Sequence, residues 1–95
     1  MPTYLIERNI EGIGASSRAE LGVLSAQLCA ALDELGTSIQ WVRSFITEDA
    51  VYCTYIARNE EIVREHARRT VFPITRITVI RGVIDPATAE STWTR

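Results

Sequence analysis

The side chains best suited to metal chemistry in this sequence are the single histidine, His66, the thiol of Cys53 and the carboxylate of Glu7. Neutral imidazole is the commonest protein ligand for nickel, copper and zinc, and sulfur or carboxylate oxygen can complete such a site. No two of these residues stand at a diagnostic ligand spacing. The pattern predicts that His66, with Cys53 or Glu7, holds a divalent metal; a hydrogen-bonded structural role for His66 is the alternative.

A second group of residues indicates a cavity for a small organic molecule. Strand alternation places Trp41, Arg43 and Phe45 on one side of a predicted strand, and Tyr55 lies in the strand that follows. A buried arginine on an apolar face needs an anionic or hydrogen-bonding partner. Arg43 pairs with Glu7 or emerges at the sheet edge, or it binds an anionic ligand. The alternative function is therefore an enzyme or binding protein for a small aromatic or anionic molecule, with Arg43 holding the negative charge.

Other chemistries are not indicated by the sequence. No serine or acidic partner forms a recognisable triad with the histidine, and no glycine-rich loop follows a strand, so we expect a binding protein rather than an enzyme. The net charge is -2 and lysine is absent, which argues against a nucleic-acid partner. No apolar run reaches the length of a signal peptide or membrane span, and the predicted location is the cytoplasm without membrane contact.

The chain of 95 residues predicts one domain that begins with a strand over residues 3–8. A capping box at residues 17–20 and Gly36 bound a leucine-striped helix. Residues 39–57 form a hairpin around the turn at residues 47–49, and Asn59 caps a second helix that carries His66. A last strand spans residues 75–84, and residues from about 87 to 95 form a flexible tail.

This order of elements predicts the α+β class and the ferredoxin-like βαββαβ fold. Its antiparallel four-stranded sheet carries both helices on one face. The other face would display large apolar side chains, which a monomer tolerates poorly. We therefore predict a homodimer through the open sheet faces, forming a dimeric α/β barrel around a shared cavity.

Alternation leaves open which face of the second hairpin strand meets the helices. If that face carries Tyr52, then Cys53 faces the dimer cavity and is separated by the sheet from His66 in the core. The sequence therefore does not decide whether His66 and Cys53 reach one metal site.

Several segments resemble a family of small bacterial ferredoxin-like proteins known as nickel-binding-protein-like, formerly a domain of unknown function. They are YLIER, IQWVRSFITEDAVYCTYIA, VREHARR, FPITRI and VIDPATAE. The resemblance implies a dimeric ferredoxin-like fold and nickel as the bound metal, with no established reaction. The positions that match the family's motifs are Glu7, Trp41, Tyr52, Cys53, Tyr55 and His66.

The sequence departs from the family pattern at Arg43, where relatives often carry histidine. If that histidine is a ligand, a guanidinium in its place repels a divalent ion. Arg43 therefore weakens the expectation of nickel binding for this member.

Overall fold

The computed structural model describes residues 1–70 and 72–93. Its strands are β1 (Thr3–Asn9), β2 (Ile39–Ile46), β3 (Ala50–Ala57) and β4 (Arg76–Ile80). Its helices are α1 (Arg18–Leu35), α2 (Glu60–Arg68) and α3 (Pro86–Trp93), with short 3-10 turns η1 (Ile13–Ala15) and η2 (Gly36–Ser38). Within the described residues, no helix combines the length and the apolar character needed to cross a membrane.

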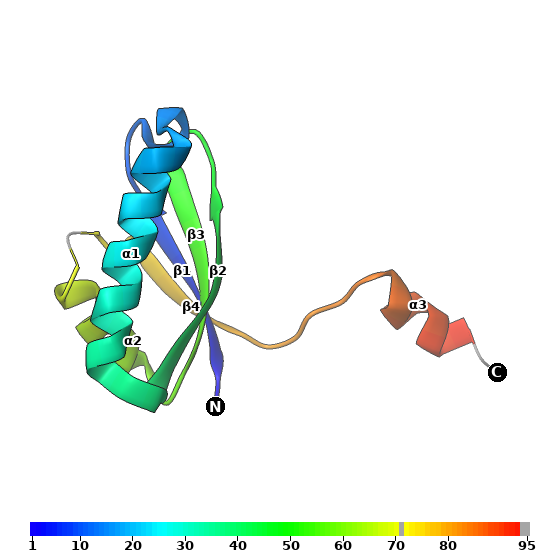
Figure 1. Ribbon diagram of the computed structural model, residues 1–95. Helices are drawn as coiled ribbons and strands as arrows, with labels where there is room; N and C mark the ends of the chain where they lie inside the picture. The colour runs from blue at the N-terminus through cyan, green and yellow to red at the C-terminus, as the bar shows by residue number, and fades with distance from the viewer. Residues whose placement is uncertain (71, 94–95) are drawn as a thin grey trace.

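The four strands form one sheet in the order β2-β3-β1-β4, and every neighbouring pair is antiparallel. Helices α1 and α2 lie together on one face of this sheet, and the opposite face carries no helix layer (Figure 1). This α+β arrangement confirms the predicted antiparallel sheet with two helices on one face and is consistent with a ferredoxin-like fold. The structure describes one protomer, so the dimeric barrel stays a prediction.

The two main helices begin where the sequence signals place them. Ser17 and Glu20 form a reciprocal capping box at the start of α1, and Gly36 ends that helix with a φ of 66°. Asn59 accepts a hydrogen bond from the Ile62 amide at 3.0 Å and so caps α2. On α2, His66 is fully buried.

The core lies between the helices and one face of β1 and β3. On β1, Tyr4, Ile6 and Arg8 are buried, whereas Leu5 and Glu7 point to the open face. On β3 the buried face carries Val51, Cys53, Tyr55 and Ala57. Strand alternation therefore places Cys53 on the helix-facing side, which decides the question that the sequence left open.

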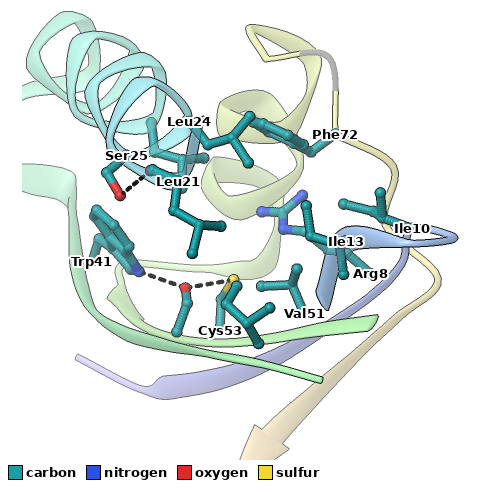
Figure 2. A pocket seen from close by; sticks show the side chains of 13 residues that line it. Arg8, Ile10, Ile13, Leu21, Leu24, Ser25, Trp41, Val51, Cys53 and Phe72 are labelled. Carbon is teal, nitrogen blue, oxygen red and sulfur yellow. Dashed lines mark hydrogen bonds between the residues drawn. The ribbon is translucent and has the colours of Figure 1, made fainter. Parts of the chain in front are cut away.

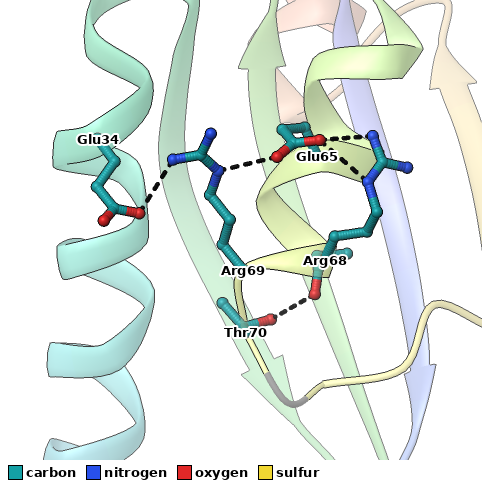
Figure 3. A network of polar contacts seen from close by, with 6 residues as sticks. Glu34, Glu65, Arg68, Arg69 and Thr70 are labelled. Carbon is teal, nitrogen blue, oxygen red and sulfur yellow. Dashed lines mark hydrogen bonds and ion pairs between the residues drawn. The ribbon is translucent and has the colours of Figure 1, made fainter.

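A surface ion-pair network joins α1 to the end of α2 (Figure 3). Glu65 pairs with Arg68 at 2.6 Å and with Arg69 at 2.9 Å, and Arg69 also reaches Glu34 of α1 at 3.1 Å. These charges are largely exposed, so water and salt screen them. The network connects the two helices, and packing against the sheet supplies most of their stability.

The C-terminal region differs from its prediction. Strand β4 ends at Ile80, four residues early, and residues that we expected to form a flexible tail belong to α3. Asp85 accepts a hydrogen bond from the Thr88 amide at 3.2 Å, and Thr88 Oγ1 accepts one from the Asp85 amide at 3.1 Å. With Pro86 at the first helical position, these residues cap a helix start that we interpreted only as a turn. Residues 94 and 95 of the expected tail lie outside the described residues.

Candidate functional site

A cavity of about 320 Å³ lies between α1 and the helix-facing side of the sheet. Its walls are mostly apolar, with Leu21, Leu24 and Leu28 contributed by α1 and Val51 by β3 (Figure 2). Ligand pockets commonly combine such apolar walls with a few polar groups, and this volume is at their small end. The cavity is therefore large enough for a small molecule and lies within a single protomer.

The charged residue of this cavity is Arg8, which is only 2% exposed. Its Nη1 donates a hydrogen bond to the Pro73 carbonyl at 3.2 Å, and its Nη2 donates a long one to the Tyr55 hydroxyl at 3.5 Å. The Arg8 Nε is buried and has no hydrogen-bond partner, and none of the ion pairs among the described residues includes Arg8. A positive charge thus lies beside the cavity without a carboxylate to balance it.

A chain of hydrogen bonds fixes the β2 and β3 side of the cavity. The Trp41 Nε1 donates to Ser44 Oγ at 2.9 Å, and Ser44 Oγ donates to Cys53 Sγ at 2.8 Å (Figure 2). Cys53 is 1% exposed, so its thiol is enclosed by this contact and by the core. These polar atoms satisfy one another, which orients the Trp41 ring as a wall of the cavity.

His66 is fully buried on α2, next to Tyr55. Its Nε2 lies 3.2 Å from the Leu28 carbonyl, which can only accept, so Nε2 carries the hydrogen and Nδ1 keeps a free lone pair. Burial lowers the pKa of His66, and the nearby charge of Arg8 lowers it further, against the opposing effect of the Leu28 hydrogen bond. His66 is therefore a neutral imidazole whose buried Nδ1 has no hydrogen-bond partner.

The structure brings only part of the predicted metal set together. His66 and Cys53 lie on the helix side of the sheet, whereas Glu7 points to the open face and cannot share an ion with them inside one protomer. Within the described residues, no three His, Cys, Asp or Glu side chains are grouped as metal ligands. The Nδ1 of His66 fits a metal donor, because ligating imidazoles commonly donate their other N–H to a carbonyl. His66, Cys53 and Glu7 as one set do not fit a single ion.

The expectation that Trp41, Arg43 and Phe45 share a face is wrong. A bulge between Trp41 and Arg43 shifts the register, so that Trp41 pairs with Tyr55 on the helix side while Arg43 pairs with Thr54 on the open side. Arg43 and Phe45 are exposed there, whereas Tyr55 is fully buried on the other side. The four residues predicted to line one cavity therefore divide between the two faces.

The sequence prediction did not include Arg8 among the cavity residues, although the signal was present. Alternation along the first strand already places Arg8 with Tyr4 and Ile6. A charged residue on the buried face of a strand is unusual and requires a polar or charged partner. The same reasoning was applied above to Arg43. Arg43, the arginine that the sequence singled out, is exposed on the open face instead.

The fold and the cavity define a small α+β protein of ferredoxin-like type whose pocket lies between its sheet and its helices. Residues 4–80 match the family model "Nickel responsive protein SCO4226-like", and the chain belongs to that family. The crystal structure of SCO4226 from Streptomyces coelicolor A3(2) is similar, with a TM-score of 0.64 and 16% sequence identity. The match covers 86% of this chain and 99% of that one, and at this identity it shows the shared fold. No curated protein matches the chain.

Proposed function

We propose that this protein is a cytoplasmic, homodimeric binding protein for nickel or a similar divalent transition metal, without catalytic activity. The observation that carries the proposal is the match of residues 4–80 to a nickel-responsive family. The open sheet face supports the homodimer, because Phe45 is 56% exposed there and apolar surface of this kind favours association.

His66 is the donor that this proposal assigns to the metal. Its Nδ1 lone pair is buried and has no hydrogen-bond partner, and its Nε2 is anchored on the Leu28 carbonyl. Cys53 lies in the same layer, but its sulfur already accepts a hydrogen bond from the Ser44 hydroxyl, and Glu7 points to the open face. The remaining ligands at His66 would be water or groups that rearrange on binding.

Arg8 opposes a cation at His66, since its charge already lowers the pKa of this imidazole. A divalent ion at Nδ1 would experience the same repulsion. Removing the charge of Arg8 should therefore strengthen nickel binding if His66 is the ligand. Arg8 and His66 are thus expected to be coupled electrostatically, although they do not stand at a ligand spacing in the sequence.

The experiment is calorimetric titration of nickel, with zinc and copper alongside, into metal-stripped protein that carries no histidine tag. Wild type should bind nickel saturably at a simple ratio per protomer. His66→Gln should abolish that binding, because glutamine keeps a donor for the Leu28 carbonyl but lacks the imidazole lone pair. Arg8→Met should bind nickel more tightly than wild type.

Two matched variants locate the site independently. Cys29→Ser removes the exposed thiol and should leave the affinity unchanged, so that adventitious binding at the surface is recognised. Glu7→Gln tests the open face. A loss of nickel binding in this variant alone would place the metal site between protomers at the open face and not at His66. Absence of nickel binding in folded wild-type protein would overturn the proposed function.

A further inference from the structure

We propose that the cavity beside Arg8 binds a small carboxylate with an apolar body, such as an aromatic or branched aliphatic acid. This site is distinct from the metal proposal, because His66 is not among the residues that line the cavity. It also differs from the predicted anion site at Arg43, which is exposed on the opposite face of the sheet.

The need for an anion follows from the surroundings of Arg8. Arg8 is 2% exposed, its Nε has no hydrogen-bond partner, and it forms no ion pair within the described part of the chain. A guanidinium remains charged at physiological pH, and a buried charge without a counterion is strongly disfavoured. A bound carboxylate would supply both the missing acceptor and the missing negative charge.

The rest of the cavity defines what the carboxylate must carry. Leu21, Leu24 and Leu28 of α1 line the cavity, as do Phe72 and Ile13. These side chains offer no hydrogen bonds, so the body of the ligand must be apolar. The volume of about 320 Å³ restricts that body to a small ring or a short branched chain.

The other polar groups of the cavity are already paired, which leaves recognition to Arg8. Ser25 Oγ donates to the Leu21 carbonyl at 2.9 Å, while Trp41, Ser44 and Cys53 form their own chain of hydrogen bonds. One positive charge balances one negative charge. A monoanionic carboxylate therefore fits better than inorganic phosphate, which would bring excess charge into apolar surroundings.

The test uses full-length, tag-free protein in buffer with a chelator, so that the result does not depend on nickel. Calorimetry would measure binding of phenylacetate and 4-methylpentanoate, with phenylacetamide as the neutral match and inorganic phosphate as the anion without an apolar body. The carboxylates should bind at one per protomer. Phenylacetamide should bind about 10- to 100-fold more weakly than phenylacetate, as expected for the loss of a charge-assisted hydrogen bond.

Three variants assign the binding to this cavity. Arg8→Met should weaken the binding of phenylacetate about 10- to 100-fold. Leu24→Trp keeps Arg8 but fills the cavity, and it should also prevent binding. Arg43→Met removes an exposed arginine on the other face and should leave the affinity unchanged. Thermal unfolding reports whether each variant is folded, and phenylacetate should raise the Tm of wild type and Arg43→Met only.

The proposal is overturned if phenylacetamide binds as tightly as phenylacetate, or if Arg8→Met or Leu24→Trp binds phenylacetate as wild type does. It is also overturned if folded wild-type protein binds neither carboxylate at millimolar concentration. Preferential binding of phosphate would contradict the assigned ligand class. None of these results bears on the nickel titration, so the two proposals fail separately.

Discussion

At the residue scale, the buried polar side chains of this core meet around Tyr55. Arg8 Nη2 donates to the Tyr55 hydroxyl, and the His66 ring packs against Tyr55 with a centroid separation of 5.3 Å. Burial raises the pKa of Tyr55 above its usual range, so its hydroxyl stays neutral. Tyr55 therefore cannot balance the charge of Arg8, which is consistent with the proposed carboxylate ligand.

The pKa of His66 predicts a pH dependence of stability. Burial and then the Arg8 charge lower this pKa, and the Leu28 hydrogen bond raises it, with a net shift downward from 6.5. As the pH falls through about 6.5, the unfolded chain protonates His66 before the folded chain does. The free energy of unfolding should therefore fall as the pH is lowered from 7 to 5, by at most about 1.4 kcal/mol per pH unit. Urea unfolding at a series of pH values measures this pH dependence.

Two variants separate this effect from that of the carboxylates. His66→Gln should reduce the decline between pH 7 and 5. Hydrogen bonds from Arg68 and Arg69 hold the pKa of Glu65 below its ordinary value of 4.5, so the contribution of Glu65 is lost only at lower pH. Glu65→Gln should therefore leave the pH 5 to 7 region unchanged. A wild-type protein of constant stability between pH 7 and 5 would contradict the assignment to His66.

At the element scale, the bulge in β2 decides which side chains reach the cavity. Without it, Trp41 would share a face with Arg43; with it, Trp41 and Ser44 both point to the helix side. The bulge thus makes possible the hydrogen bonds from Trp41 through Ser44 to Cys53. One extra residue in a strand reverses the face to which every later side chain of that strand points. Simple alternation of side chains does not predict such a bulge.

The turn η1 is fastened to the β2–β3 hairpin by a close backbone approach at Gly14. A Cβ at this position would lie 2.7 Å from the Thr47 carbonyl oxygen and 2.8 Å from the Glu48 Cα. We expect Gly14→Ala to destabilise the protein by about 1 to 3 kcal/mol, because the neighbouring backbone must move. Gly22 in α1 has open space around it, so Gly22→Ala should stabilise by up to about 1 kcal/mol. Denaturant unfolding measures the stability of both variants. A Gly14→Ala variant as stable as wild type would show that the close approach of η1 to the hairpin does not constrain position 14.

The sequence predicted the elements better than the site. Local signals that act within a few residues, such as the Ser17 capping box and the Asn59 cap, fixed the helix starts correctly. The cavity depends on contacts between distant segments, for example Arg8 with Pro73, which no local pattern reports. The helix after Asp85 was missed although its cap was local, because the same residues also satisfy the pattern of a turn.

At the scale of the whole molecule, one layer of helices leaves the other face of the sheet open (Figure 1). This face carries Phe45 and Leu5 beside polar residues such as Glu7 and Arg43. Beyond β4 the chain leaves the sheet, and Val83 and Ile84 are each 82% exposed on that segment. Apolar side chains on both parts favour a second protomer as their cover.

The proposed homodimer predicts that a charge on the open face disrupts association. Phe45 lies opposite Tyr52 in the sheet and is 56% exposed, so it would contribute apolar contact area to a partner sheet. Phe45→Glu should raise the Kd of the dimer about tenfold or more, because the carboxylate would be buried in the interface without a partner.

Val23→Glu is the matched control, since Val23 is 59% exposed on α1 and lies on the helix side of the molecule. Sedimentation equilibrium should report dimers for wild type and Val23→Glu and a shift to monomers for Phe45→Glu. Equal dimerisation of all three would exclude the open sheet face as the interface, and a wild type that is monomeric at high concentration would exclude the dimer itself.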